Sequence, residues 1–331
     1  MSYLTLIGGI ALLLLGGDIL IRGAVGLAER LGIPALTIGL TVVAFGTSAP
    51  ELVVSVKAAF ADAPGIAIGN VVGSNIANVL LVLGLPALIA ATRCDQAGIL
   101  RNSIYVIGAS LLFIALCYAG PLGFWHGALL LSLMVLFLAE TGRRAANHRN
   151  GRTRGAGGQT QSIEQIDGVA GVPHTAWAIF AFTVIGLVGL PAGAHLTVQA
   201  ARQIAAEWGI TEAAIGLTVV ALGTSLPELA TTLVAALRRH SGLALGNVLG
   251  SNLFNILGIM GIASMLTPIA VPERFLGVDL WIMLFTTLLV MPFAISHRPL
   301  TRLPAAGFVI AYIAYIVLVM MPTPAALAAV H

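Results

Sequence analysis

Two glutamates stand isolated within long apolar segments, each at the end of the same short motif. Glu51 ends GTSAPE (46–51), and Glu228 ends GTSLPE (223–228). A carboxylate at the middle of a membrane costs about 2.5–3.5 kcal/mol on insertion scales, against about 0.3–0.6 kcal/mol gained for each leucine or isoleucine. Such a group persists where it faces a polar cavity, takes a proton or binds a cation. The pattern therefore predicts two functional acids.

The residues before each glutamate add further oxygen ligands. Pro50 and Pro227 cannot donate a backbone hydrogen bond, and each clashes with the carbonyl four residues earlier. We therefore expect freed carbonyl oxygens at Gly46 and Gly223, where glycine tolerates an irregular backbone. Together with the threonine and serine hydroxyls of each motif, these groups form a set of hard oxygen ligands. Such a set suits Ca²⁺ or Na⁺ and not zinc or copper.

A second motif offers neutral oxygens on one helix face. Ser74 and Asn78 are four residues apart, as are Ser251 and Asn255, so each pair lies on the same side of a helix. Glycines four residues apart precede each pair and favour a close crossing of helices. We expect this crossing to bring the two glutamates to one central site.

Both motifs belong to an internal duplication. Residues 39–52 recur at 216–229 with twelve of fourteen positions identical, and 69–84 recur at 246–261 with nine of sixteen identical. The offset is 177 residues in both cases, so each half of the chain is one copy of the same unit. A copy with an odd number of membrane spans enters the membrane inverted relative to the first, as in many secondary transporters.

Composition identifies the elements that must position these residues. The 331-residue chain is 58% hydrophobic and 9% charged, whereas soluble domains carry about 25% charged residues. The sequence predicts an all-α polytopic membrane protein, built as two inverted five-helix repeats with broken core helices. The ten expected spans are 3–28, 34–61, 66–91, 101–119, 122–141, 173–204, 211–237, 243–267, 276–296 and 304–321.

The basic residues predict an orientation in the membrane. If the N-terminus lies outside, thirteen arginines fall on the inner side, whereas only Lys57, Arg202 and Arg274 fall on the outer side. Both termini are therefore expected outside, in the periplasm, with the central linker in the cytoplasm. The predicted domains are a first repeat at 1–141 (motif region 39–84), a flexible cytoplasmic linker at 142–172 and a second repeat at 173–331 (motif region 216–261).

Other readings of the chain find little support. The positive net charge comes from loop arginines and is no argument for nucleic-acid binding. Cys94 and Cys117 form neither a metal-binding nor a redox spacing. We expect no cofactor and no required protein partner beyond the lipid bilayer. Asp18 and His195, which are 177 residues apart, are interpreted as packing or local polarity.

At these motifs the sequence resembles the calcium/cation antiporter superfamily, and within it the prokaryotic sodium/calcium exchanger branch. The motifs GTSAPE and GTSLPE, followed by GNVVGSNIANV and GNVLGSNLFNI, carry the resemblance. It implies ten helices in two inverted repeats. It also implies alternating access, in which the first and sixth helices slide past a fixed core.

The resemblance also implies a ligand set. For Ca²⁺ it comprises the two glutamates and two threonine backbone carbonyls: Glu51, Glu228, Thr47 and Thr224. For Na⁺, or shared by both ions, it adds Ser48, Ser225, Ser74, Ser251, Ala44, Ala221, and the asparagines at the central position, Asn78 and Asn255. Because both central positions carry asparagine and not aspartate, a potassium requirement is not expected.

The predicted function is therefore antiport of Ca²⁺ against Na⁺ across the inner membrane of a prokaryote, with no enzymatic activity. The alternative is H⁺/Ca²⁺ antiport, because a buried glutamate can take a proton in place of Na⁺. Proton-coupled relatives typically carry GNAxE-type motifs, which favours Na⁺ here. A remote alternative is an intramembrane phosphatase of lipid diphosphates, but neither motif contains the basic residue that would hold a phosphate.

Overall fold

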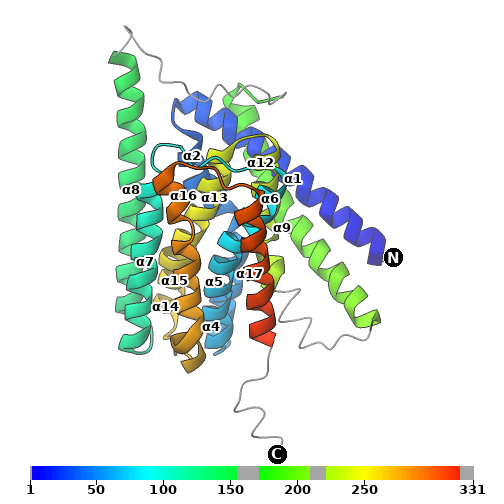
Figure 1. Cartoon of the computed structure of the whole chain (residues 1–331), viewed down its shortest axis with the longest axis vertical. Helices are drawn as coiled ribbons and strands as arrows, with labels where there is room; N and C mark the ends of the chain where they lie inside the picture. The colour runs from blue at the N-terminus through cyan, green and yellow to red at the C-terminus, as the bar shows by residue number, and fades with distance from the viewer. Residues whose placement is uncertain (1, 155–170, 209–220, 321–331) are drawn as a thin grey trace, which may run out of the picture.

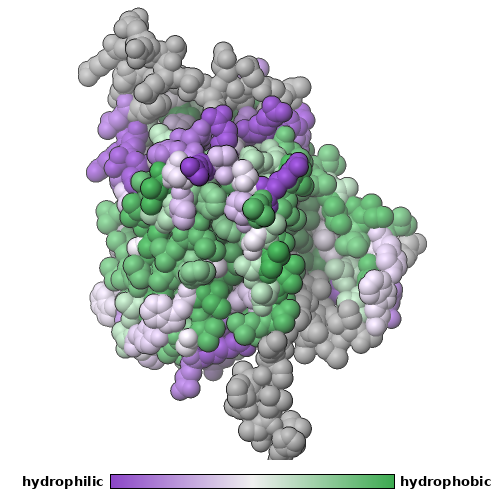
Figure 2. All heavy atoms as spheres, in the orientation of Figure 1, coloured by the Kyte–Doolittle hydropathy of each residue, from purple (hydrophilic) through white to green (hydrophobic). Residues whose placement is uncertain are grey.

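The protein is a bundle of membrane-spanning helices. A computed structural model describes residues 2–154, 171–208 and 221–320, and in these ranges the regular secondary structure is helical apart from two isolated β-bridges. Eight helices are long and apolar enough to cross a membrane, and a bent pair of helices forms a ninth candidate span. On the face shown in Figure 2, apolar side chains form a broad band, with hydrophilic residues above and below it. The predicted all-α polytopic fold is confirmed, and the chain is an integral membrane protein.

In the described residues, long continuous helices accompany core helices that are interrupted (Figure 1). The continuous helices are α1 (Ser2–Leu31), α7 (Ile99–Ala119), α8 (Phe124–Arg154), α9 (Ala176–Glu207) and α17 (Arg302–Met320). The interrupted ones include π-helical segments, labelled η. In the first half they are α2 (Ala35–Ile38), η1 (Gly39–Val43), α3 (Ala44–Thr47), α4 (Ala49–Phe60), α5 (Pro64–Ala77), η2 (Asn78–Leu83) and α6 (Gly84–Ile89). In the second half they are α11 (Ala221–Thr224), α12 (Leu226–Leu237), α13 (Ser241–Leu253), η4 (Phe254–Ile259), α14 (Met260–Leu266), η5 (Phe275–Asp279), α15 (Leu280–Leu288) and α16 (Met291–Ser296).

The fifth expected span ends much later than the sequence suggested. Helix α8 continues to Arg154, so the first part of the expected flexible linker, 142–154, is helical. Arg144 stabilises this helical extension, because its Nη2 pairs with Glu140 Oε1 one turn earlier, at 2.5 Å. The rest of the linker up to residue 170, and the start of the expected span 211–237, lie outside the described residues.

Two spans form the centre of the bundle. In the most apolar stretches of Pro64–Ile89 and Ser241–Leu266, 72% and 89% of the residues are buried, against 17–44% in the other six of the eight candidate spans. The second of these spans crosses η1 with almost no space between the backbones. A Cβ on Gly246 would lie 2.5 Å from the Leu36 carbonyl oxygen and 3.0 Å from Gly39 Cα, and one on Gly250 would lie 2.5 Å from the Leu40 carbonyl oxygen. The expected close crossing between the two halves is confirmed at these glycines.

Helices α1 and α9 pack on each other and cross the upright bundle obliquely at one side (Figure 1). Glycines permit their contact, since a Cβ on Gly9 would lie 2.6 Å from Thr197 Oγ1 and one on Gly186 would lie 2.6 Å from Leu20 Cβ. These are the first and sixth spans of the sequence, which the resemblance singled out as the moving pair.

One ionic contact ties this oblique pair to the core. Asp18 of α1 accepts a hydrogen bond from Arg238 Nε at 2.6 Å, just beyond the end of α12, and also pairs with Arg22 at 2.7 Å. Asp18 therefore has a specific ionic role, which the interpretation as local polarity did not foresee.

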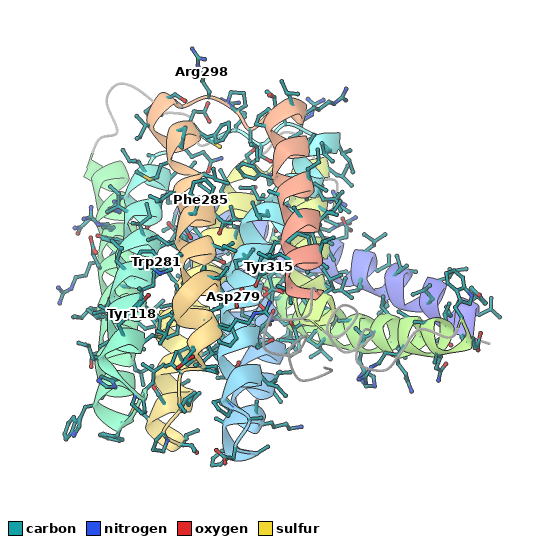
Figure 3. The ribbon with its side chains drawn as sticks, turned by 60° about the horizontal axis from the view of Figure 1, so that its bottom comes forward. Tyr118, Asp279, Trp281, Phe285, Arg298 and Tyr315 are labelled. Atoms are coloured by element: carbon teal, nitrogen blue, oxygen red, sulfur yellow. The ribbon has the colours of Figure 1, made fainter. Side chains whose placement is uncertain are left out.

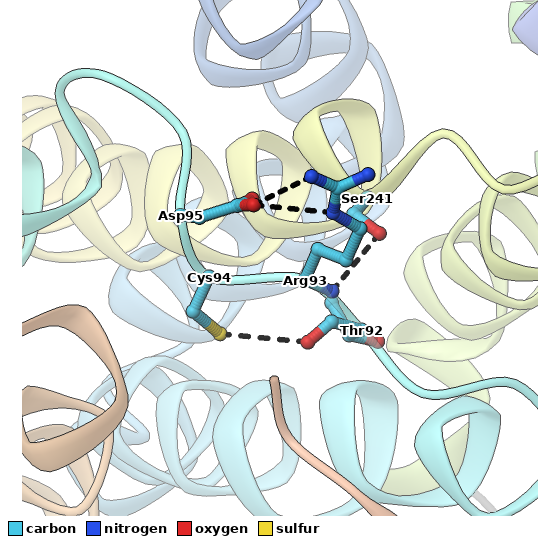
Figure 4. A network of polar contacts seen from close by, with 5 residues as sticks. All are labelled: Thr92, Arg93, Cys94, Asp95 and Ser241. Atoms are coloured by element: carbon cyan, nitrogen blue, oxygen red, sulfur yellow. Dashed lines mark hydrogen bonds and ion pairs between the residues drawn. The ribbon is translucent and has the colours of Figure 1, made fainter. Parts of the chain in front are cut away.

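A short loop between α6 and α7 packs against the start of α13 (Figure 4). The Arg93 backbone N–H donates to Ser241 Oγ at 3.0 Å, and the Arg93 side chain binds Asp95. This hydrogen bond from Arg93 lowers the pKa of Asp95 below its usual value. Burial raises the pKa of Cys94 to about 11, so this thiol is un-ionised at neutral pH and serves as a small apolar residue.

Candidate functional site

Each motif glutamate lies in the first turn of a new helix that begins after a break. The chain bends by 46° between 35–47 and 49–60, with Ser48 as the break, and Glu51 is in the first turn of α4. In the second repeat, Ser225 directly precedes α12, and Glu228 is in the first turn of that helix. The prolines stand at the start of these helices, where a missing N–H breaks no hydrogen bond. The predicted broken helices are confirmed, and the positive end of each helix dipole favours the carboxylate.

The motif glycines serve a purpose that the sequence did not reveal. Gly46 and Gly223 are absent from the positive-φ residues of the described chain, so an irregular backbone is not their reason. A Cβ on Gly46 would overlap the Leu187 side chain, and one on Gly223 would overlap that of Val198. Both neighbours belong to α9, so these glycines make room for the oblique helix beside the site.

An asparagine fixes the backbone of each glutamate. Asn70 Nδ2 donates to the Glu51 carbonyl oxygen at 3.1 Å and to Ser55 Oγ at 2.9 Å. Asn247 likewise donates to the Glu228 carbonyl oxygen at 3.3 Å. The helices that carry the carboxylates are thus held against α5 and α13.

The same asparagines join the two halves of the molecule. Thr47 Oγ1 donates to Asn247 Oδ1 at 3.2 Å, and Thr224 Oγ1 donates to Asn70 Oδ1 at 3.4 Å. The four residues form two pairs at the repeat offset of 177. The two halves therefore meet through reciprocal contacts, as expected of copies related by an approximate two-fold axis.

A second set of asparagines surrounds the centre of the site. Asn78 Nδ2 donates to Asn252 Oδ1 at 3.0 Å, and Asn255 Nδ2 donates to Asn75 Oδ1 at 3.1 Å. Asn78 and Asn255 lie in the π-helical segments η2 and η4, a geometry that is frequent at functional sites. Within the part of the chain that the structure describes, their amide oxygens have no hydrogen-bond partner.

The two motif serines are arranged differently. Ser48 Oγ donates to Glu228 Oε1 at 2.8 Å, whereas the buried Ser225 Oγ has no hydrogen-bond partner among the described residues. Because Ser48 precedes Glu51 by three residues, this bond places the Glu228 carboxylate at the break from which Glu51 projects. The expected convergence of the two carboxylates is therefore present, but the two-fold relation is broken at the serines.

Oxygen atoms without partners gather at this point. Six buried side-chain oxygens on predicted site residues have no hydrogen-bond partner in the described ranges: Glu51 Oε2, Glu228 Oε2, Ser225 Oγ, Ser251 Oγ, Asn78 Oδ1 and Asn255 Oδ1. Leaving such groups unpaired in a protein interior costs about 1–3 kcal/mol each, and more for charged groups. Because hard cations bind carboxylate and neutral oxygens of this kind, the donor set fits Ca²⁺ or Na⁺.

The other predicted ligands lie in the same region. Ala44 is buried, and its carbonyl oxygen already accepts from the Ser48 N–H at 3.0 Å, with Thr47 Oγ1 3.3 Å away. Ala221 is the first residue of α11, and its side chain lies outside the described part. Ser74 lines a cavity of about 410 Å³ together with Asn70 and Thr224. The cavity also reaches Gly65 at the start of α5 and Val319 near the end of α17.

Sequence reasoning missed four asparagines of the network: Asn70, Asn75, Asn247 and Asn252. Each occurs in the second motif at the 177-residue offset. Identity between the repeats could have identified them, because polar residues kept in both copies of a buried helix need partners.

Comparison with known proteins agrees with this geometry. A sequence profile of the sodium/calcium exchanger protein family matches residues 1–140 and 178–321. The chain is 34% identical to the putative antiporter CaxA of Alkalimonas amylolytica over 93% of its own length and 95% of that protein. It is 30% identical to the sodium/calcium exchanger MaX1 of Methanosarcina acetivorans, over 96% and 97% of the two chains.

A solved structure gives the same result. The sodium-calcium exchanger NCX_Mj, soaked with Na⁺ and Ca²⁺, superposes with a TM-score of 0.80 and 30% sequence identity, over 97% of this chain and 99% of that one. Sequence and fold therefore agree over nearly the whole length. This chain belongs to the sodium/calcium exchanger protein family.

Proposed function

We propose that the protein is an antiporter that exchanges Ca²⁺ for Na⁺ at the site between Glu51 and Glu228. Membership of an exchanger family supports cation exchange involving Ca²⁺, carried out by a transporter and not by an enzyme. The observation that carries the proposal is the cluster of buried oxygens without partners, which includes one oxygen of each carboxylate.

Two neighbouring carboxylates explain why the ions exchange. One Ca²⁺ or several Na⁺ can neutralise them, and a shared set of oxygens cannot hold both loads at once. The predicted Ca²⁺ ligands are the two carboxylates and the Thr47 and Thr224 carbonyls. The serine, alanine and asparagine oxygens are predicted to bind Na⁺ or to be shared by both ions. Without a bound cation, two buried charges make a conformational change costly, so movement is coupled to occupancy.

Alternating access completes the proposal. The two repeats, 1–141 and 173–331, form the core and the α1–α9 pair, and this pair slides to open the site to one side at a time. The arginine distribution places both termini on the periplasmic side of an inner membrane. The cavity lined by Ser74 and Thr224 then opens toward the outer face.

Transport in membrane vesicles tests the proposal. Vesicles loaded with Na⁺ and diluted into Na⁺-free medium are expected to take up radioactive Ca²⁺, and Glu51→Gln or Glu228→Gln should reduce uptake to that of protein-free vesicles. Glu140→Gln is the matched control, because this glutamate lies in a span but binds Tyr105 and Arg144 outside the site. Wild-type uptake in either motif variant refutes the site, and uptake driven by a pH gradient but not by Na⁺ identifies an H⁺/Ca²⁺ antiporter instead.

A further inference from the structure

An ion pair lies in the wall of the cavity that leads to the candidate site. Arg274 and Asp279 both line this cavity, together with Ser74 and Thr224 of the site itself. Arg274 Nε is 3.3 Å from Asp279 Oδ2. A guanidinium on the route of a cation is unexpected, because it repels the ions that must pass.

The surroundings of the pair fix its acidic partner. Asp279 is the last residue of η5, and its side chain is only 3% exposed. Tyr315 Oη of α17 donates to Asp279 Oδ1 at 3.4 Å. Figure 3 shows Asp279 and Tyr315 side by side between α15 and α17.

The basic partner is held less tightly. The Arg274 side chain is 40% exposed, and its Nη2 donates to the Val319 carbonyl oxygen near the end of α17 at 3.5 Å. Because Asp279 is buried and Arg274 reaches solvent, the carboxylate determines where the guanidinium sits.

The pair has no equivalent in the first repeat. Subtracting the offset of 177 from the two positions gives Ala97 and Asn102, neither of which is charged. The Arg274–Asp279 pair is therefore not duplicated, even though the ligand motifs are.

We propose that Arg274 and Asp279 set the apparent affinity for cations entering from the outer face, with Asp279 neutralising Arg274 beside the ion route. The proposal rests on the exchange function proposed above. Asp279 is a positioning residue for Arg274 and not a ligand of the transported ion. Without Asp279, the positive charge of Arg274 would repel passing cations. Without Arg274, the negative charge of Asp279 would attract them.

The two single variants test the sign of the effect. Asp279→Asn leaves Arg274 unpaired and is expected to raise the external KM for Ca²⁺, whereas Arg274→Gln is expected to lower it. The double variant should return close to the wild-type KM. A rise of the external KM in both single variants overturns the proposal, since loss of packing would act in the same direction in both.

Ion charge supplies a second readout. Because Coulomb energy is proportional to the charge of the ion, a tenfold rise in the KM for Ca²⁺ in Asp279→Asn should accompany a rise of only about threefold in half-saturating external Na⁺. Equal shifts for the two ions overturn the proposal.

Sidedness and a matched variant complete the design. Right-side-out and inverted membrane vesicles present the two faces in turn, and the KM at the inner face should stay at the wild-type value. Asp62→Asn is the control, because Asp62 is an exposed acid in the turn between α4 and α5, at the same end of the molecule. A shift of equal size in Asp62→Asn overturns the proposal. If wild-type protein transports Ca²⁺ only under a pH gradient, the exchange function fails while the Ca²⁺ comparisons still decide the role of the pair.

Discussion

Replacing Ser48 with alanine should shift the balance between the two states of the transporter. The Ser48 hydroxyl donates to Glu228 Oε1 at 2.8 Å, while the equivalent Ser225 hydroxyl has no partner. Helix α9 packs beside both breaks, so when the α1–α9 pair slides past the core, we expect the two repeats to exchange their local arrangements at these breaks. Ser225 then binds Glu51, and Ser48 loses its partner. Each serine then stabilises one state only.

The expected size of this population shift follows from the strength of the hydrogen bond between Ser48 and Glu228. A hydrogen bond to a charged group contributes about 1.5–3 kcal/mol, and 1.4 kcal/mol corresponds to a factor of ten in an equilibrium constant. Ser48→Ala should therefore reduce the population of the observed state relative to the opposite one by about 10-fold to 150-fold. Ser225→Ala should shift the balance in the other direction.

Accessibility of the cavity measures this population. Val54 lines the cavity, and Val54→Cys can be labelled with a membrane-impermeant maleimide after Cys94 and Cys117 have been replaced. In buffer without Na⁺ and Ca²⁺, Ser48→Ala should slow labelling from the outer side, whereas Ser225→Ala should leave it unchanged or accelerate it. Slower labelling in both serine variants would refute the reasoning, as would no change in Ser48→Ala.

Two further substitutions test the contacts that frame the site. Gly250→Ala should destabilise the protein by about 1–3 kcal/mol through overpacking, because its Cβ would lie 2.5 Å from the Leu40 carbonyl oxygen; a lower Tm in detergent checks this. Gly108→Ala is the control, since this exposed glycine of α7 has no described atom within 4 Å of such a Cβ, and an equal loss of Tm in both variants contradicts the packing argument. Asp18→Asn should release α1 from Arg238 and weaken the observed state by about 1 kcal/mol, slowing the same cavity labelling; unchanged labelling shows that the ion pair does not hold the state.

The duplication explains how much of the site the sequence predicts. Glu51 and Glu228 are recognisable because a charge inside an apolar span has few explanations other than function. Their convergence follows from the shared offset, since equivalent residues of inverted repeats meet near one axis. Ser74, Asn78 and their counterparts follow from helical spacing alone.

Other features depend on neighbours that no local pattern names. The reason for Gly46 is the Leu187 side chain of α9, which is distant in sequence. Asp279 lies outside both motifs, and only the cavity shows that it faces the same space as Ser74. The difference between Ser48 and Ser225 is invisible in the sequence because the motifs around them are nearly identical.

That difference separates the constant contacts of the site from those that change. The bonds of Thr47 to Asn247 and of Thr224 to Asn70 map onto each other under the repeat offset, so they need not break when the repeats exchange conformations. The bond from Ser48 to Glu228 has no such counterpart, so it must break in the exchange. The asparagine network is therefore expected to persist through transport and to hold both carboxylate helices in place, while the serines change partners around it. A disulfide that cross-links the helices of the asparagine network should then leave transport intact. A disulfide that fixes the break at Ser48 against α12 should stop transport.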